Sequence, residues 1–248
     1  MSTRASPQAE LERLQTQLAE RDRQAAAKEA QLEHYAADLR ETFKSERARS
    51  RELEQSYVAT VRALTNAVEA RDAYTGKHAE RVAAYGLEIA RPLAPDLAAD
   101  PQTEFGFLLH DVGKVAIPDG ILHKGDTLTE AEETLMRQHP LIGWGILHHV
   151  PYLEVASQVV RSHHERWDGK GYPDGLAGDA IPLAARIFSV VDTLDAITTD
   201  RPYRKSSPLE TARRVIREAS ETQFDPQVVD ALDQVTDARL EELRRQVG

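Results

Sequence analysis

The stretch His110-Asp111-Val112-Gly113-Lys114 places an imidazole and a carboxylate side by side at the end of an apolar segment. An apolar run that begins near Pro101 precedes the pair and Gly113 follows it, so the sequence predicts a helix that ends here. The negative end of a helix dipole favours a cation by roughly 0.3–1 kcal/mol, which suits a metal ion or the amine of Lys114. Taken alone, the pair fits a helix-capping histidine beside a surface aspartate better than a metal site, so the rest of the chain has to decide between the two.

Length, charge and cysteine content limit the classes of protein that the chain can belong to. Its 248 residues allow one sizeable core with an extension, or two small domains. The absence of cysteine excludes disulfides and thiolate metal ligands and fits a reducing cytoplasm. We find neither a signal peptide nor an apolar run near the roughly 20 residues that a membrane helix needs. We therefore expect a soluble, cytoplasmic protein that does not bind a membrane.

The net charge of −10 is distributed unevenly along the chain. Residues 1–65 contain 11 basic and 11 acidic residues, which leaves 20 of the chain's 31 basic residues and 30 of its 41 acidic residues for residues 66–248. Such an acidic second part argues against DNA or RNA binding, because general binding of nucleic acids depends on the neutralisation of many phosphates. A phosphate-bearing substrate would therefore need a local positive site.

Residues 1–65 differ in composition from the rest of the chain. Residues 8–65 contain no Gly or Pro and are rich in Ala, Glu, Arg, Gln and Leu, which are helix-forming residues. Apolar residues recur at steps of three and four between Leu11 and Leu39, with Arg21 and Lys28 at intervening core positions, and a four-residue step to Phe43 resets the phase. The pattern predicts a coiled-coil segment over residues 1–65 that forms a homodimer and passes on a signal. The alternative is a solvated single helix that lies along its own domain or frays when alone.

Residues 66–248 have the pattern of one compact helical domain. Apolar residues recur at helical spacing between segments rich in Pro and Gly, and no convincing period-two alternation predicts a strand. The predicted fold class is therefore all-α, with a multi-helix domain preceded by the long helix. The local signals are a loop over residues 91–101, a capping box at Thr129 with Glu132, a helix end at His139-Pro140, a glycine-rich loop over residues 169–178, an apolar helix opened by Pro182, a capping box at Ser207 with Glu210, and a helix start at Asp225-Pro226.

Asp192 is a carboxylate in an apolar helix. Burial of an unpaired carboxylate costs several kcal/mol, so Asp192 requires a cation or a strong hydrogen-bond partner. A salt bridge to Arg186 or Arg201 is the alternative to a metal ion. The adjacent histidines His163 and His164 directly precede the glycine-rich loop. We interpret the remaining histidines of the domain and the long helix as surface or packing residues, namely His34, His123, His148 and His149.

Histidines and aspartates recur along successive predicted helices of this domain, from His78 to Asp192. Imidazole and carboxylate ligands without thiolate favour iron or manganese over structural zinc. The set is too large for one ion, so we predict two divalent metal ions that share Asp111, with room for a bridging hydroxide and substrate oxygens. The predicted metal ligands are His78, His110, Asp111, His139, His163, His164 and Asp192.

Several separated motifs between about residues 70 and 235 agree with one known family. They are residues 72–78 with Arg81-Val82, residues 110–114 with 117–119, His139-Pro140, residues 163–173 with Gly171-Tyr172-Pro173, residues 192–195, and residues 200–205. In these motifs the chain resembles the HD-GYP domain, a branch of the HD superfamily of metal-dependent phosphohydrolases known for degrading the bacterial messenger cyclic di-GMP.

The resemblance implies roles for particular residues. It implies an all-helical fold, an iron- or manganese-type cluster with the ligand set above, and Asp111 as the bridging, catalytically essential ligand. Lys114 would contact the scissile phosphate, and Arg201 with Lys205 would hold the phosphates or guanines of the dinucleotide. The loop of Tyr172 would shape the mouth of the pocket or dock a protein, and these two interpretations stay open.

Two departures from the family pattern narrow these expectations. Some members hold a third metal ion with a glutamate four positions before the first histidine, where this chain has Tyr74, so we expect two ions. The segment from His123 to Asp126 departs from the usual one, which leaves the shape of that loop open.

Three functions are compatible with the motifs. The first is hydrolysis of cyclic di-GMP to linear pGpG, and further to GMP, by water attacking phosphorus in line with the leaving oxygen. The second is hydrolysis of another cyclic dinucleotide. The third is a signalling module that binds partners such as diguanylate cyclases or an upstream sensor through the loop and the coiled coil.

Overall fold

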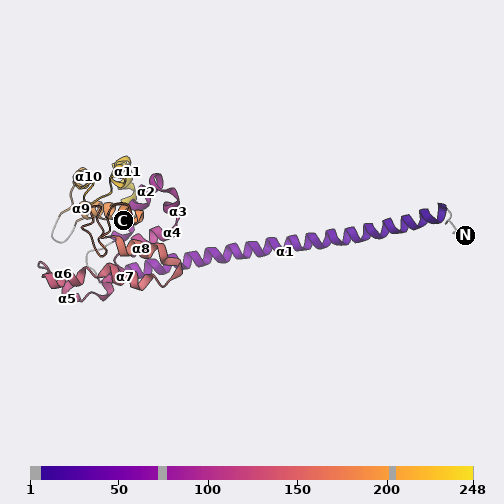
Figure 1. Ribbon diagram of the computed structural model, residues 1–248, viewed down its shortest axis with the longest axis horizontal. Coiled ribbons are helices and arrows are strands. Elements are labelled where there is room, and N and C mark those ends of the chain that lie inside the picture. Colours follow the sequence, from indigo (N-terminus) through magenta and orange to yellow (C-terminus); the bar gives the residue numbers. More distant parts are fainter. Residues whose placement is uncertain (1–6, 72–76, 201–204, 248) are drawn as a thin grey trace. The chain divides into compact units, whose positions relative to one another are not determined.

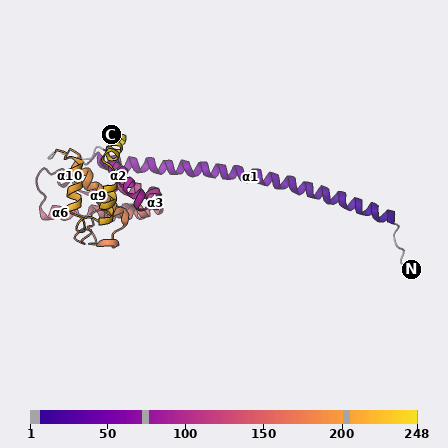
Figure 2. The same cartoon turned by 90° about the horizontal axis from the view of Figure 1, so that it is seen from above.

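The computed structural model describes residues 7–71, 77–200 and 205–247, and these residues are helical apart from loops and two isolated β-bridges. This confirms the predicted all-α fold class. The chain begins with α1 (Pro7–Glu69), which Figures 1 and 2 show as one unbroken helix. It is followed by α2 (His78–Leu93), α3 (Pro95–Ala99), α4 (Pro101–Leu108), the 3-10 helix η1 (Val112–Ala116), α5 (Asp119–Leu122), α6 (Glu130–Met136), α7 (His139–Leu147), η2 (Pro151–Leu153), α8 (Glu154–Ser162), η3 (Gly178–Ala180), α9 (Leu183–Thr198), α10 (Leu209–Glu218), α11 (Pro226–Gln234) and α12 (Asp237–Val247).

The chain divides into two units, Met1–Tyr57 and Val58–Gly248. In the first unit the helix leaves its apolar residues accessible, with Leu18 exposed by 60% and Leu32 by 67%. Apolar side chains at heptad spacing that one chain leaves accessible are what a coiled-coil partner would cover.

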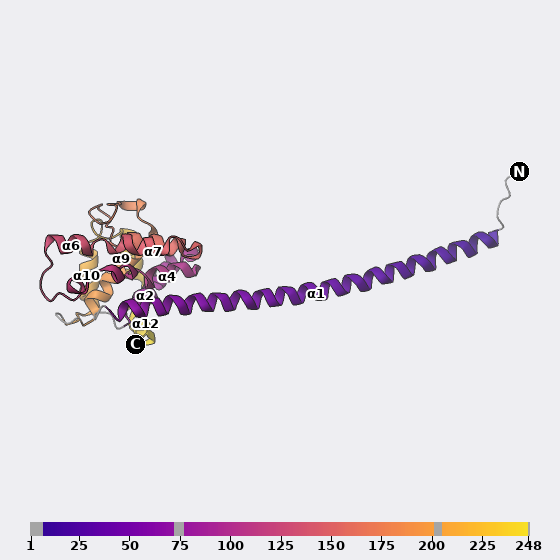
Figure 3. The same ribbon diagram turned by 90° about the horizontal axis from the view of Figure 1, so that it is seen from below.

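The second unit is built around α9. This helix contacts α2, α8, α10 and α11, which Figure 1 labels around it, and Figure 3 shows α9 beside α10 from below. Its residues Ile187, Phe188 and Leu194 are almost fully buried, because α9 is apolar on most of its circumference and neighbours cover it on several sides. Pro182 occupies the N-cap position, as the sequence predicted. A polar side chain on α9 therefore points either into the core or into a site that the core surrounds.

The last turns of α1 belong to the second unit. Val61 and Thr65 are buried there, and the hydroxyl of Thr65 donates to the carbonyl oxygen of Leu108 at 3.2 Å. The compact unit thus begins within α1, at Val58.

Several local predictions are confirmed and others are wrong. The capping box of Thr129 and Glu132 opens α6, and Asp225 caps α11 by accepting from the backbone N–H of Gln227. The predicted capping box at Ser207 is wrong, because Pro208 is the N-cap of α10 and no side-chain cap forms there.

Two boundaries also differ from the sequence prediction. Pro140 does not close a helix: α6 ends at Met136, and Pro140 lies in the first turn of α7, where a missing N–H costs nothing. Residues 91–101 are not one loop, because α2 continues to Leu93 and α3 follows, opened by Pro95. Within the parts of the chain that the structure describes, no helix combines the length and the apolar character that crossing a bilayer requires.

Candidate metal centre

A cavity of about 330 Å³ lies where α2, η1, α8 and α9 meet. The helix ends supply most of the polar side chains around it, because a histidine at the first or last turn of a helix can point away from the apolar core. His78 and His139 are the first residues of α2 and α7, and Asp192 lies midway along α9. The structure brings all seven residues of the predicted ligand set into this region: His78, His110, Asp111, His139, His163, His164 and Asp192.

Asp111 is at the centre of the set. Its Oδ2 lies 3.0 Å from Nε2 of His110 and 2.8 Å from Nζ of Lys114. Its Oδ1 lies 3.3 Å from Nε2 of His139. The two oxygens of one carboxylate thus face imidazoles from two different parts of the chain.

Three histidines form the tightest group. Single ligand atoms of His139, His163 and His164 all lie within 4.8 Å of one another. The Nε2 atoms of His139 and His163 are 3.1 Å apart, and the ring centres of His163 and His164 are 4.1 Å apart. Imidazole nitrogens this close can converge on a single ion.

Backbone carbonyls set the orientation of three of these rings. The Nδ1–H of His110 donates to the carbonyl oxygen of Phe107 at 2.9 Å. His139 donates in the same way to Met136 at 2.8 Å, and His163 to Val160 at 2.7 Å. A carbonyl oxygen only accepts, so each ring carries a proton on Nδ1 and turns its Nε2 into the site, where Nε2 of His110 faces the carboxylate of Asp111. The same three-residue spacing at each histidine prepares all three rings as ligands.

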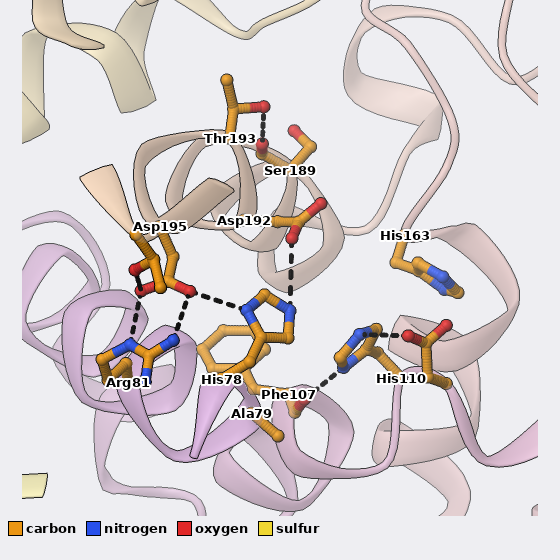
Figure 4. Close-up of polar contacts among 12 residues, drawn as sticks. His78, Ala79, Arg81, Phe107, His110, His163, Ser189, Asp192, Thr193 and Asp195 are labelled. Atoms are coloured by element: carbon orange, nitrogen blue, oxygen red, sulfur yellow. Dashed lines mark hydrogen bonds and ion pairs between the residues drawn. The ribbon is translucent and has the colours of Figure 1, made fainter. Parts of the chain in front are cut away.

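His78 is oriented by a carboxylate instead. Figure 4 shows its ring between two aspartates of α9: Nε2 lies 3.4 Å from Asp192 Oδ1, and Nδ1 lies 2.8 Å from Asp195 Oδ2. Asp195 also accepts from the guanidinium of Arg81 at 2.7 and 2.9 Å. Burial raises the pKa of Asp195, but the hydrogen bonds from His78 and Arg81 outweigh it and hold that pKa well below its usual range. A carboxylate–histidine pair of this kind fixes the ring and strengthens its basicity toward a metal ion.

Asp195 is the site residue that the sequence prediction missed. Its signal was available, because Asp192 and Asp195 are three residues apart on one helix, as are His78 and Arg81 on another. The alternative partner Arg186 does not contact Asp192 but bonds Asp179 and Asp225.

The protonation states of the cluster suit metal binding. Burial, together with the neighbouring imidazoles, lowers the pKa of His163 well below its usual range, and burial lowers the pKa of His164 to about 3. Burial also lowers the pKa of His139. Burial raises the pKa of Asp111, but His110 and Lys114 outweigh it and bring that pKa far below its ordinary value. Burial lowers the pKa of His110 as well, but the carboxylate of Asp111 outweighs it and raises that pKa, so a bound cation would take the place of a proton there. The other three imidazoles are neutral beside an ionised carboxylate, which is the donor set that a divalent cation needs, so the residues fit such an ion.

The loop of Tyr172 borders the cluster. The ring of Tyr172 stacks on His164 with centres 4.7 Å apart, and the guanidinium carbon of Arg137 lies 5.2 Å from the ring centre. Glu165 holds the loop, since its buried carboxylate accepts from the backbone N–H groups of residues 174–176. Gly171 is required there, because a Cβ would lie 2.4 Å from the nitrogen of Arg166. The predicted turn-rich loop is thus an ordered wall of the site.

The remaining predicted site residues are placed differently. Lys205 is exposed and lies 3.3 Å from Asp200, which lines the cavity. Arg201 and Tyr74 lie outside the described residues. His148 stacks on Trp144 at 4.0 Å and His34 is exposed, in agreement with their interpretation as packing and surface residues.

The second unit is an all-helical domain that gathers imidazoles and carboxylates from successive helices around one cavity, and its histidine cluster could hold a metal ion. The chain belongs to the HD domain family, whose sequence profile matches residues 62–228. This confirms the family that the motifs predicted.

Similar proteins share this domain. The chain is 37% identical over 207 residues to the "Cyclic di-GMP phosphodiesterase response regulator RpfG" of Xanthomonas campestris, across 78% of this chain and 55% of that protein. It is 39% identical over 171 residues to "3'3'-cGAMP-specific phosphodiesterase 2" of Vibrio cholerae, across 68% of this chain and 33% of that protein. The crystal structure of a cyclic GMP-AMP specific phosphodiesterase of V. cholerae has the same fold, with a TM-score of 0.57 and 21% identity over 75% of this chain and 52% of that chain. The chain thus spans about half the length of such relatives, or less.

Proposed function

We propose that the protein is a metal-dependent phosphodiesterase that hydrolyses cyclic di-GMP to linear pGpG, and further to GMP. The observation that carries the proposal is the environment of Asp111, whose two oxygens face imidazoles from different elements while the amine of Lys114 lies 2.8 Å away. The names of relatives with 35–42% identity, among them RpfG, support the substrate class.

The ions in this proposal are two divalent metal ions, iron or manganese, that share Asp111. Imidazole and carboxylate oxygens without thiolate support these metals over structural zinc. When bound, such ions supply an activated water and neutralise charge that develops on the phosphate. The proposed ligands are His78, His110, Asp111, His139, His163, His164 and Asp192.

Residues beside the cluster bind and orient the substrate in the proposal. Lys114 donates to a non-bridging oxygen of the scissile phosphate and offsets the negative charge that grows as water attacks. Tyr172 shapes the mouth of the pocket beside His164, and Arg201 with Lys205 holds the remaining phosphate or a guanine. Positive charge concentrated in the pocket in this way lets an acidic domain accept an anionic substrate.

A second cyclic dinucleotide is the alternative substrate. The relative from V. cholerae named as specific for 3'3'-cGAMP favours this alternative, because it shares 39% identity with the chain. A panel of cyclic di-GMP, 3'3'-cGAMP and cyclic di-AMP at equal concentration separates the two, since kcat/KM for the true substrate exceeds the others at least tenfold.

We also propose how the chain divides into domains and which partners it binds. Residues 1–65 form a coiled-coil homodimer that conveys a signal to the catalytic domain of residues 66–248, and the accessible leucines of α1 support this. The Tyr172 loop and the coiled coil could instead make the protein a signalling module for diguanylate cyclases or an upstream sensor. In that case Asp111→Ala would abolish turnover and leave the cellular phenotype intact.

The test is an anaerobic hydrolysis assay on protein loaded with iron or manganese, with products separated by chromatography. The proposal predicts pGpG, or GMP once pGpG is cleaved in turn, from wild-type protein and neither product from Asp111→Ala at equal protein concentration. Intact cyclic di-GMP after incubation with metal-loaded wild-type protein would contradict it.

A further inference from the structure

Arg71 lies just beyond the end of α1 and bonds the segment that carries Lys114. Its guanidinium donates to the carbonyl oxygen of Lys114 at 3.4 Å, to that of Val115, and to that of Ile117 at 3.2 Å. We propose that Arg71 is a positioning residue for Lys114: it fixes the backbone of η1 and thereby keeps the amine beside Asp111. This inference rests on the proposed function, in which the Lys114 amine binds the scissile phosphate.

The chemistry of a short helix end explains why η1 needs such a partner. The last carbonyl groups of a helix lack donors from the same helix, and a 3-10 helix of five residues such as η1 has few internal bonds to begin with. Lys114 O accepts from the N–H of Ile117 at 3.0 Å. A guanidinium carries five N–H donors in a rigid plane, so one Arg71 side chain can bond several of these carbonyls at once. A lysine ammonium would lack this planar fork.

The ion pair of Arg71 contributes less than these backbone contacts. Its guanidinium also donates to Asp119 at 2.6 Å, but the Asp119 side chain is 71% exposed. Exposed pairs contribute roughly 0–1 kcal/mol because solvent screens them. The bonds to the partly buried carbonyl groups of Lys114 and Ile117 are therefore the ones that define the role of Arg71.

A close contact between Gly113 of η1 and the backbone of α7 leaves little room for η1 to move. A Cβ at Gly113 would lie 1.9 Å from the carbonyl oxygen of His139 and 2.6 Å from the nitrogen of Gly143. The backbones of η1 and α7 therefore touch, and Lys114 is the residue that follows this contact. If the bonds to Arg71 are lost, η1 can shift. Such a shift changes the distance between Lys114 and Asp111. It also changes the packing of η1 against His139, the first residue of α7 and a proposed metal ligand.

The end of α1 makes two more contacts of the same kind. Thr65 donates to the carbonyl oxygen of Leu108, two residues before His110. The Glu69 carboxylate accepts from the backbone N–H of Ala79 at 3.1 Å, the residue after His78. Together with Arg71 they connect one end of α1 to the backbone beside three parts of the site, and Arg71 is the contact that acts on the substrate-binding amine.

A double-mutant cycle with Lys114 tests the proposal. If Arg71 acts through Lys114, Arg71→Ala lowers kcat/KM by about tenfold or more in the wild-type background, but by less than about threefold in the Lys114→Ala background. Arg71→Lys keeps the charge without the planar fork, so it recovers less than half of the lost activity. Arg62→Ala is the matched control: Arg62 lies in α1, nine residues before Arg71, and among the described residues its ion pairs are with Glu80 and Glu104, each at 3.8 Å. It leaves kcat/KM unchanged.

Hydrogen–deuterium exchange supplies a readout that is independent of turnover. Arg71→Ala accelerates exchange at the amides of residues 112–117 at least tenfold, whereas Arg62→Ala leaves the exchange rates unchanged. The bound-metal content is the same in both variants as in wild-type protein. Equal losses for Arg71→Ala in both backgrounds, full recovery by Arg71→Lys, or unchanged exchange over residues 112–117 would each overturn the inference. If wild-type protein hydrolyses no cyclic dinucleotide, the proposed function fails, and the exchange measurement alone decides whether Arg71 positions η1.

Discussion

Replacement of Asp195 by asparagine separates metal affinity from protein stability. Asp195 accepts from His78 at 2.8 Å and from Arg81 at 2.7 and 2.9 Å, and only 1% of it is exposed. Asparagine keeps the size and one acceptor oxygen but removes the charge. The variant Asp195→Asn therefore changes the partner that orients His78 without opening a cavity.

The expected loss of metal affinity follows from the change in that hydrogen bond. A hydrogen bond to a charged group contributes roughly 1.5–3 kcal/mol and a neutral one roughly 0.5–1.5 kcal/mol. The difference of about 1–1.5 kcal/mol corresponds to about tenfold weaker metal binding. This agrees with the roughly 10–100-fold loss that follows removal of a residue supporting a metal-ligating histidine.

The matched control is Arg81→Gln, which breaks the same ion pair but leaves the carboxylate to His78. Breaking a buried pair costs up to about 3–5 kcal/mol, so both variants lower the free energy of unfolding. Competition with a chelator should then give about tenfold weaker metal binding for Asp195→Asn, and affinity within about threefold of wild type for Arg81→Gln. Equal losses of metal affinity in the two variants would refute the reasoning, because general destabilisation would then explain both.

Two further predictions concern stability. Gly113→Ala places a Cβ 1.9 Å from the carbonyl oxygen of His139, so it should lower the free energy of unfolding by about 3 kcal/mol or more. A Cβ at Gly145 has no heavy atom within 4 Å, so Gly145→Ala should not lower it in this way, and equal melting temperatures of the two variants would contradict the prediction. Burial lowers the pKa of His164 to about 3 in the folded protein, whereas the pKa of a histidine in the unfolded chain is about 6.5. As pH falls below about 6.5, His164 therefore takes up a proton in the unfolded chain but not in the folded one, and metal-free protein loses stability. The loss from this imidazole reaches about 2 kcal/mol at pH 5, and urea titrations at pH 7 and pH 5 should show a smaller difference for His164→Gln; an unchanged difference would argue against it.

The sequence was informative where a polar or charged residue interrupts an otherwise apolar segment. Asp192 lies in an apolar helix, and His110 with Asp111 directly follows the end of another, so each signals a polar partner without any knowledge of the fold. The order of these residues along successive helices identified the set that the structure brings together. The fold class followed in the same way from helical spacing and from segments rich in Pro and Gly.

Contacts between distant segments were less accessible to sequence reasoning. The pairing of Asp195 with His78 and Arg81 depends on how α2 crosses α9, and 117 and 114 residues separate the partners. Arg71 reaches η1 across a shorter gap, 43–44 residues in the sequence. Pro140 illustrates a local ambiguity, because proline both ends helices and occupies their first turn, and only the packing of η1 against α7 distinguishes the two.

The number of metal ions per chain tests the central claim most directly. Elemental analysis of protein saturated with iron or manganese and freed of excess metal should give two ions per chain for wild type. It should give fewer than one for Asp111→Ala, because that variant removes the carboxylate that both ions share. One ion or fewer in saturated wild-type protein, or two in Asp111→Ala, would contradict the account.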